Sequence, residues 1–218
     1  MENSVVSAQP SIIAVVTGDL VGSSKLTTAD FQQVMSALEK QLKQFSIRYN
    51  SAYDIFRGDS FQVQTQPQLA ARLATIIDLT LRSHSPSVMV RQCIGIGTGS
   101  ASEQSVKTAT GEAYLLSGHG LDDIKGRGLR IHCANQNFQT QMALLTRFFD
   151  SHLERLTSTQ SYVVLTYLLA ENKSHEHLAR VLDKKRSNVT RILNTSQYHL
   201  IADYLDYFAL QVKKEFTL

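Results

Sequence analysis

Residues 12–24 read IIAVVTGDLVGSS, and they predict the first strand of the chain and the segment that leads into its first helix. It opens with a continuous apolar run, Ile12 to Val16, which is typical of a strand buried on both faces. The run ends at Gly18-Asp19, and Thr27 then predicts the N-cap of a helix, with Asp30 as its capping-box partner three residues later. That helix carries apolar residues at steps of three and four, which indicate one core-facing stripe: Phe31, Val34, Leu38, Leu42, Phe45 and Tyr49.

The residues that follow continue the alternation of strands and helices. Two short segments, Tyr53 to Phe56 and Phe61 to Thr65, are joined by Arg57-Gly58-Asp59-Ser60, which is typical of a hairpin turn because glycine tolerates a positive φ. Pro67 predicts the start of a second helix, and a further strand is expected from Val88 to about Gly97. Strand, helix, strand, strand, helix, strand is the order of a ferredoxin-like split βαβ unit. After it, the pattern predicts a helix over 111–124, a strand over 129–133 and a long helix over 138–156.

The composition is that of a folded globular protein. Of 218 residues, 43% are hydrophobic and 19% are charged, which argues against disorder, and a net charge of +3 by itself indicates no partner. Cys93 and Cys133 have neither CxxC spacing nor a histidine at ligand spacing, so we expect buried thiols in a reducing compartment. The N-terminus, Met1 to Ser4, lacks the features of a signal peptide, and the apolar run after it is too short for a membrane span. We therefore expect a cytoplasmic protein with no membrane anchor.

The predicted topology should bring two aspartates together. In the ferredoxin-like arrangement the first strand lies between the third and the fourth, so its end at Asp19 meets the start of the third strand at Asp59. Two carboxylates at one sheet edge repel each other unless a cation lies between them, and Mg²⁺ or Mn²⁺ prefers oxygen ligands. The sequence therefore predicts a metal site at Asp19 and Asp59. The alternative is that each aspartate belongs only to a turn or a helix cap.

The segment after Asp19 resembles a phosphate-binding loop in its composition. It lies between a strand end and a helix, where backbone N–H groups can line an anion site. Gly22 permits close approach, and Ser23 and Ser24 add hydroxyl donors. The predicted nucleotide-binding residues are Leu20, Val21, Gly22, Ser23 and Ser24.

A second glycine-rich segment, Gly95-Ile96-Gly97-Thr98-Gly99, lacks the GxGxxG spacing of a dinucleotide loop. Glycines inside a strand mark a bulge or a close backbone approach, and we expect that approach to admit a base or a ribose near the aspartates. Four histidines show no ligand spacing with a carboxylate, so surface or structural roles are expected for most of them: His119, His132, His175 and His177.

Residues 178–192 have the spacing of a helix-turn-helix. Ala179 is the small residue where two helices would touch, and Leu182, Val189 and Ile192 follow at inward-facing offsets. The expected turn spans Asp183 to Arg186. Aspartate can stand at its first position, because it tolerates the left-handed conformation that such a turn needs.

The residues around this unit predict its limits and its packing. Ser174 and Ser187 are the expected N-caps of its two helices, and a helix over 161–171 would pack behind them. The residues after it form an apolar helical stripe that either covers the core of the module or pairs two subunits, so a homodimer is a possible state. This stripe consists of Tyr198, Ile201, Leu205, Phe208 and Val212.

The outer face of the second helix combines cations with amide and hydroxyl groups, a mixture suited to phosphates and to base edges in the major groove. The cations cluster here instead of spreading evenly, which favours double-stranded DNA over the alternative of a helical bundle with a solvated basic face. The predicted DNA-binding residues are Lys184, Lys185, Arg186, Ser187, Asn188, Thr190 and Arg191.

Three motifs together resemble the successive signatures of class III nucleotidyl cyclase catalytic domains: VTGDLVGSS at 16–24, FRGDSF at 56–61 and IGIGTG at 94–99. With the helix-turn-helix, the chain from about Ile12 to its end resembles the SatD family of bacterial proteins. The resemblance implies that Asp19 and Asp59 bind a metal pair together with the Leu20 carbonyl. It also implies that the amides of residues 22–24 seat a triphosphate.

The chain departs from the cyclase pattern at three positions. Ile55 stands where cyclases usually have a base-reading lysine, and Leu115 and His119 align with the transition-state asparagine and arginine. Loss of that arginine removes a charge that stabilises the transferring phosphates.

These departures favour a sensor over a catalyst. We expect an α+β chain with a ferredoxin-like, nucleotide cyclase-like βαββαβ domain over residues 1–155 and an all-α helix-turn-helix domain over 156–218. The expected function is a DNA-binding transcriptional regulator whose first domain binds a metal-nucleotide. The alternative is an active Mg²⁺- or Mn²⁺-dependent nucleotidyl cyclase or nucleotidyltransferase. A third possibility is a helix-turn-helix protein with a vestigial ligand site.

Overall fold

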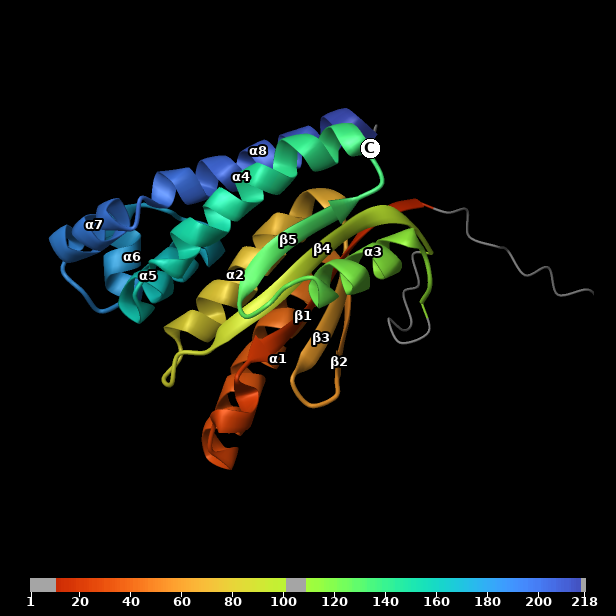
Figure 1. Ribbon diagram of the computed structural model, residues 1–218. Helices are drawn as coiled ribbons and strands as arrows, with labels where there is room; N and C mark the ends of the chain where they lie inside the picture. The colour runs from red at the N-terminus through yellow and green to blue at the C-terminus, as the bar shows by residue number, and fades with distance from the viewer. Residues whose placement is uncertain (1–10, 101–108, 217–218) are drawn as a thin grey trace, which may run out of the picture.

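A five-stranded mixed sheet forms the centre of the first part of the chain (Figure 1). The structure, a computed structural model, describes residues 11–100 and 109–216. The strands are β1 (Ser11–Val21), β2 (Ala52–Phe56), β3 (Ser60–Thr65), β4 (Met89–Gly99) and β5 (Gly128–Cys133). Their order across the sheet is β2-β3-β1-β4-β5, with β1 antiparallel to both of its neighbours and β5 parallel to β4. The predicted βαββαβ unit, with its first strand between the third and the fourth, is confirmed.

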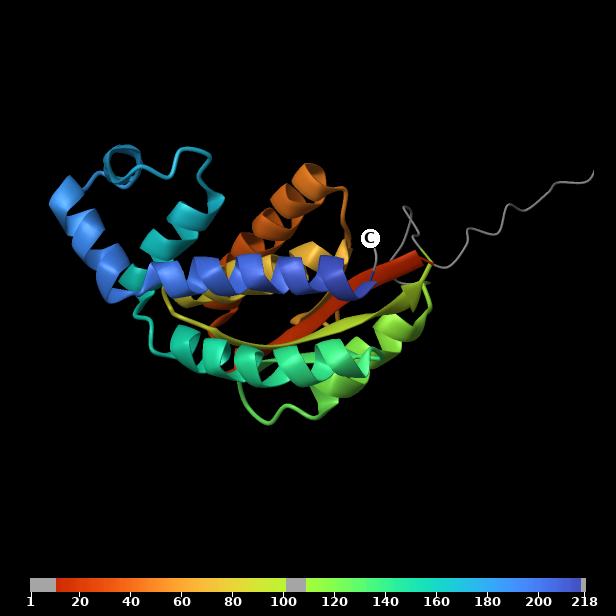
Figure 2. The ribbon, with the colours of Figure 1, turned by 90° about the horizontal axis from the view of Figure 1, so that it is seen from above.

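Helices cover both faces of the sheet, and a helical region follows it. The helices of the first part are α1 (Thr28–Tyr49), α2 (Ala70–Ser83), α3 (Glu112–Asp122) and α4 (Gln136–Glu154), with short 3-10 turns η1 (Ser23–Lys25) and η2 (Pro67–Leu69). The C-terminal helices are α5 (Ser158–Leu169), α6 (His175–Val181), α7 (Arg186–Thr195) and α8 (Tyr198–Phe216). Seen from above, α1 and α3 lie on opposite sides of the sheet (Figure 2). The chain is therefore α+β, with a C-terminal helical region, as the sequence predicted.

Helix α1 begins and packs as its sequence predicts. Thr27 is the N-cap and its side chain accepts a hydrogen bond from the Asp30 amide. The middle of the expected stripe, from Val34 to Phe45, is buried against the sheet, whereas Phe31 and Tyr49 at its two ends are half-buried.

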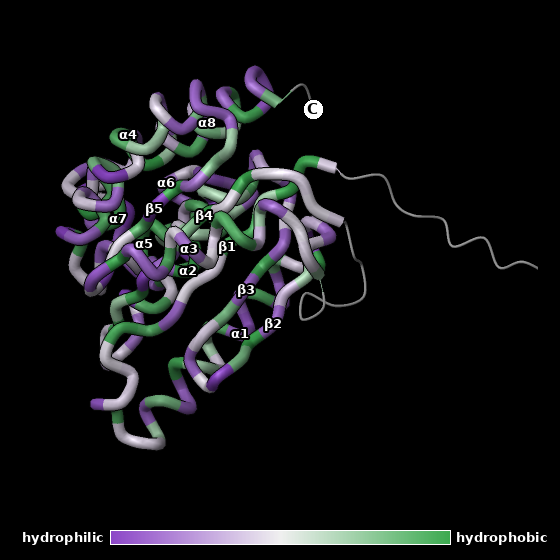
Figure 3. The backbone as a smooth tube through the Cα atoms, turned by 45° about the vertical axis from the view of Figure 1, so that its right-hand side comes forward, coloured by the Kyte–Doolittle hydropathy of each residue, from purple (hydrophilic) through white to green (hydrophobic). Residues whose placement is uncertain are grey.

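Helix α2 begins after Pro67, as predicted, and is buried almost all round. The sheet lies on one side of it, and the C-terminal helices α5 and α8 contact the other. One apolar cluster therefore runs from the strands through α2 into the C-terminal helices, and Figure 3 shows the hydrophobic stretches of β1 and β4 in the middle of the molecule. The division of the chain at residues 155 and 156 stays a prediction.

Helix α3 fills the space that the glycines of β4 leave open. A Cβ atom on Gly95 would lie 2.2 Å from the Ala113 carbonyl oxygen and 2.5 Å from the Ser117 amide nitrogen. The Ser117 hydroxyl also hydrogen-bonds the hydroxyl of Thr17 on β1, at 2.8 Å. The expectation that these glycines admit a base or a ribose is wrong, because they admit a helix of the same chain.

A buried ion network ties α2 to α4 through the residue before β5. The Arg127 side chain, which is 9% exposed, lies 2.5 Å from the Asp150 carboxylate and 3.6 Å from that of Asp78. Asp78 also pairs with Arg82 at 3.2 Å. Burial raises the pKa of Asp150 above its ordinary value, although the Arg127 charge lowers it in part.

The C-terminal helices agree with the sequence in part. Ser174 caps α6 as predicted, and Asp183 in the turn has the expected left-handed conformation, with φ 49°. The prediction of Ser187 as the N-cap of α7 is wrong, because α7 begins at Arg186 and its N-cap is Lys185. The Lys184 amide donates a hydrogen bond to the Ala179 carbonyl oxygen at 2.9 Å, which closes the C-terminal end of α6.

The apolar stripe of α8 covers the core of its own chain. All five of its residues are buried, and α8 contacts both α2 and α4. The alternative that this stripe pairs two subunits is therefore wrong. A homodimer stays a prediction, but the α8 stripe would not be its interface.

The remaining expectations concern the cysteines and the membrane. Cys93 and Cys133 are buried free thiols, as predicted, and burial raises their pKa values to about 12 and about 11. Within residues 11–100 and 109–216, none of the helices has the length and apolar character that a membrane crossing requires.

Candidate functional site

Asp19 and Asp59 line one pocket at the end of β1. The antiparallel register places Asp19 opposite Ser60, and the Leu20 amide donates a hydrogen bond to the Asp59 carbonyl oxygen at 3.2 Å. The pocket has a volume of about 270 Å³, and Val21, Gly22, Arg91 and Gly126 complete its wall. The topology thus brings together the two carboxylates that are forty residues apart in the sequence.

The hairpin between β2 and β3 holds Asp59 in this position. Arg57 and Gly58 both have positive φ, at 52° and 87°, which turns the chain within three residues. The Ser23 hydroxyl then donates to one Asp59 carboxylate oxygen at 2.5 Å, so the hairpin is tied to the segment after β1.

Arg91 neutralises Asp19, and this residue was not among those predicted from the sequence. Its Nε and one terminal nitrogen donate to the two Asp19 carboxylate oxygens at 2.6 and 2.8 Å, a bidentate pair. Its other terminal nitrogen donates to the Ile124 carbonyl at 3.0 Å, which fixes the loop after α3. The hydrogen bonds with Asp19 raise the pKa of the Arg91 guanidinium, which favours its charged form. One signal was present in the sequence, since Arg91 is a cation inside an apolar strand that neighbours β1.

The predicted phosphate-binding residues divide into two groups. Leu20 and Val21 belong to β1, where the Leu20 side chain is buried in the core. Gly22 has φ 74° and begins the 3-10 turn η1. Among the described residues, the amides of Gly22, Ser23 and Ser24 find no acceptor, so these three N–H groups are open to an anion.

The donor set can be compared with what a divalent cation requires. Two carboxylates in one pocket match the preference of Mg²⁺ and Mn²⁺ for oxygen. Both Asp19 oxygens, however, are bonded to Arg91, and no group of three or more His, Cys, Asp or Glu side chains in the described part of the chain is placed to hold a metal ion. The residues therefore fit one cation, on condition that Arg91 releases Asp19, and they do not fit a preformed metal pair.

None of the three residues that depart from the cyclase pattern supplies a permanent positive charge. Ile55 is half-buried in β2 and packs against the main core. Leu115 on α3 is 63% exposed, and His119, one turn later, is exposed as well. Neither residue of α3 supplies a cation that is permanently charged.

The predicted DNA-binding residues lie at the start of α7 and in the turn before it. Most are exposed, whereas Asn188 and Thr190 are half-buried. The Thr190 hydroxyl hydrogen-bonds His175 Nδ1 at 2.9 Å, so it joins α7 to α6, and Arg191 donates to the Asn188 side-chain oxygen at 2.9 Å.

A groove of about 540 Å³ runs along the outer face of α7. It is lined by Arg186, Ser187, Thr190 and Arg191, and by two residues that the sequence analysis missed, Asn194 and Thr195. The signal for these two was their helical spacing, since they follow Thr190 and Arg191 by one turn. No acidic side chain lines this groove.

Comparison with known proteins gives a distant similarity of fold. No family model matches the chain, and no curated protein was found to match it, so membership of the SatD family stays a prediction. Among solved structures, the chain is similar to class III cyclase catalytic domains. The guanylyl cyclase Cya2 is 19% identical, with 57% of this chain and 76% of that chain covered and a TM-score of 0.43.

Two further solved structures show the same level of similarity. The non-canonical dimeric guanylyl cyclase domain of the RhoGC fusion protein from the aquatic fungus Blastocladiella emersonii is 15% identical, with 57% and 81% covered and a TM-score of 0.45. The adenylyl cyclase CyaB from P. aeruginosa is 15% identical, with 56% and 77% covered and a TM-score of 0.40. These similarities concern the fold, over somewhat more than half of this chain.

Proposed function

We propose that the protein is a DNA-binding regulator whose pocket at Asp19 and Asp59 binds the phosphates of a nucleotide with one divalent cation. The single observation that supports this most strongly is the composition of that pocket, which holds two carboxylates beside the left-handed Gly22, with the amides of Ser23 and Ser24 following directly in the chain. Carboxylates attract a cation, and open amides attract phosphate oxygens.

The charges of the pocket explain why a cation and a nucleotide would bind together. Asp19, Asp59 and Arg91 sum to one negative charge, which repels a free triphosphate. Mg²⁺ or Mn²⁺, held by Asp19 and Asp59, would supply the charge that phosphates need. The cation and Arg91 compete for Asp19, and in the empty pocket Arg91 neutralises that carboxylate.

The same residues favour sensing over turnover. Leu115 and His119 bring no permanent positive charge to a transferring phosphate, and the Ile55 side chain packs into the core. Binding requires only the pocket, whereas phosphoryl or nucleotidyl transfer also requires stabilisation of the developing charge.

A binding assay combined with a product assay tests the nucleotide half. Each nucleoside triphosphate is titrated in turn with Mn²⁺ by calorimetry, and pyrophosphate release is measured in the same samples. We expect saturable binding without turnover, lost in Asp59→Asn and retained in Asp203→Asn, which removes an exposed carboxylate on α8. No binding of any of the four nucleotides would contradict the proposal.

For the DNA half, the support comes from the outer face of α7. Exposed Arg186 and Arg191 lie in a groove with hydroxyl and amide groups and without acidic side chains. Cations of this kind contact phosphates, while amides and arginines read base edges. Helix α6 packs behind, held to α7 through the bond from His175 to Thr190.

The salt dependence of duplex binding tests this face. Arg186→Gln and Arg191→Gln should each weaken binding and lower the log–log salt slope by about 1. Arg147→Gln, which removes an exposed arginine from α4, should change neither quantity. An unchanged slope in both α7 variants would refute the assignment of DNA binding to this helix.

One observation favours a second candidate, an Mg²⁺- or Mn²⁺-dependent nucleotidyl cyclase or transferase. Both carboxylates that such chemistry needs line one pocket. Pyrophosphate release that disappears in both Asp19→Asn and Asp59→Asn would support the enzyme over the sensor.

A further inference from the structure

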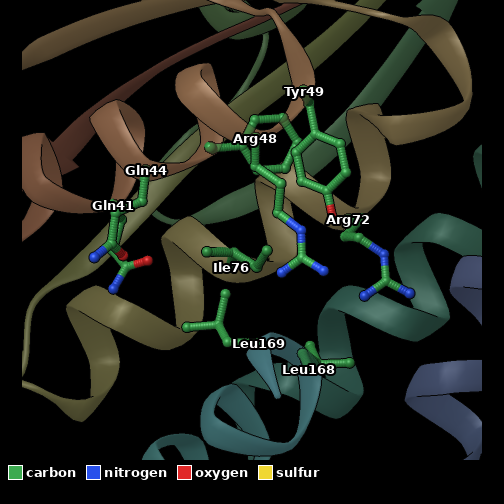
Figure 4. Close-up of a pocket in the computed structure, with 9 residues that line it drawn as sticks. Gln41, Gln44, Arg48, Tyr49, Arg72, Ile76, Leu168 and Leu169 are labelled. Carbon is green, nitrogen blue, oxygen red and sulfur yellow. The ribbon is translucent and has the colours of Figure 1, made fainter. Parts of the chain in front are cut away.

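A second pocket lies on the other side of the sheet, where α1 and α2 meet α5 (Figure 4). Its cavity volume is about 210 Å³, below the range of roughly 300–1,000 Å³ that is typical of sites for drug-sized ligands. Phe45, Ile76 and Leu168 form an apolar floor, and Arg48 and Arg72 stand at the rim. Its lining shares no residue with the pocket of Asp19 and Asp59.

The two arginines have no acidic partner within the described part of the chain. Neither guanidinium forms an ion pair with a carboxylate of residues 11–100 or 109–216, and no acidic side chain lines the pocket. Figure 4 shows both guanidinium groups side by side, directed into the space above the α5 leucines. Arg48 also lies over the ring of Tyr49, at 5.5 Å from its centroid, which holds it at the rim. Two unpaired planar donors at one opening form a strong site for an oxyanion.

A third cation increases the positive potential at this place. Lys173, in the loop after α5, lies over the ring of Tyr167 at 4.9 Å. Burial, followed by the nearby charge of Arg72, lowers the pKa of its ammonium group, with a smaller contribution from Arg48. The three cations therefore act on one region of space, and only Asp206 opposes them at Lys173.

We infer that this pocket binds a small organic anion with an apolar body and a carboxylate or phosphate group. The oxyanion would accept hydrogen bonds from Arg48 and Arg72, and the apolar body would lie on Phe45, Ile76 and Leu168. Gln41 and Gln44, also at the rim, would add neutral donors. The ligand would join α1 and α2 to α5, the helix that leads into α6 and α7. Binding at this site would therefore be coupled to the packing of the C-terminal helices.

Calorimetry without divalent cation tests the inference with four probes: phenyl phosphate, benzoate, inorganic phosphate and phenol. Phenyl phosphate or benzoate should bind saturably, and the stronger of the two identifies the oxyanion. Inorganic phosphate lacks the apolar body and phenol lacks the oxyanion, so both should bind at least about 10-fold more weakly.

Variants assign the binding to this pocket. Arg48→Gln and Arg72→Gln should each weaken the stronger probe by about 10-fold, because each removes a charge-assisted hydrogen bond. Gln44→Glu should have a similar effect at an exposed position with little risk to folding, because it sets a carboxylate beside Arg48. The matched control is Arg147→Gln combined with Arg155→Gln, which removes two exposed charges elsewhere and should leave the affinity unchanged.

Three outcomes would overturn the inference. One is the absence of saturable binding of both phenyl phosphate and benzoate at millimolar concentration. Another is unchanged affinity in Arg48→Gln and Arg72→Gln, and the third is an equal loss in the control pair. Asp59→Asn should bind the probe as the wild type does, which separates this site from the proposed nucleotide pocket.

Discussion

Replacing Arg91 by methionine should increase the affinity of the Asp19 pocket for Mn²⁺. Arg91 holds both Asp19 oxygens, at 2.6 and 2.8 Å, so a cation that binds Asp19 must first break two charge-assisted hydrogen bonds. Bonds of this kind contribute about 1.5–3 kcal/mol each. The Arg91 side chain is 34% exposed, so water replaces part of the lost interaction, and the lower limit of about 3 kcal/mol applies. Arg91→Met should therefore bind Mn²⁺ roughly 100-fold more tightly.

The assay is a Mn²⁺ titration followed by electron paramagnetic resonance, which counts free Mn²⁺. Arg57→Met is the matched control, because it removes an exposed arginine from the hairpin that carries Asp59 without touching the Asp19 carboxylate. A double variant, Arg91→Met with Asp19→Asn, should lose the gain. If Arg91→Met binds Mn²⁺ no more tightly than Arg57→Met does, Arg91 does not compete with the cation for Asp19.

Three further predictions concern the framework of the fold. Gly95→Ala should destabilise the protein by about 1–3 kcal/mol, because the added Cβ meets backbone atoms of α3. Gly118→Ala, with open space around it in the helix, should stabilise the protein by up to about 1 kcal/mol. Thermal unfolding of both variants measures the two effects. Arg127→Met should cost about 3–5 kcal/mol at pH 8, because it removes the closest cation from the buried Asp150 carboxylate, and less at pH 5. The pKa of Asp150 is raised in the folded state, so this carboxyl stabilises the fold at low pH and loses that contribution as the pH rises through its folded pKa. Urea unfolding of the variant and the wild type at both pH values should therefore show a larger loss of stability at pH 8 than at pH 5. Asp183→Gly should stabilise by about 0.5–1 kcal/mol, because φ is positive there, and an unchanged midpoint of unfolding would contradict this.

The sequence was informative wherever local rules decide the structure. The apolar run from Ile12, the cap at Thr27 and the turn at Gly58 determine strand, helix and hairpin, and the order of these elements predicts the sheet. The meeting of Asp19 with the β3 hairpin followed from that order alone, because antiparallel pairing fixes which strand ends are neighbours.

The parts that were missed depend on contacts between distant segments. Arg91 reaches Asp19 through the register of β4 against β1, which a single sequence does not reveal. The glycines of β4 indicate that something approaches the strand closely, but the sequence alone does not say whether it is a ligand or a helix. In the structure it is α3. The pocket at Arg48 and Arg72 exists only because α5 returns to α1 and α2, so no local pattern predicts it.

If the protein is a nucleotide-dependent DNA-binding regulator, a bound nucleotide must change its affinity for DNA. The affinity of the full chain for a labelled mixed-sequence duplex is measured at fixed salt, without nucleotide and then with each nucleoside triphosphate in the presence of Mn²⁺. The account predicts that at least one nucleotide changes the duplex Kd by about 5- to 150-fold, as for a coupling of about 1–3 kcal/mol, and that Asp59→Asn abolishes the change. The same Kd under all conditions would contradict it.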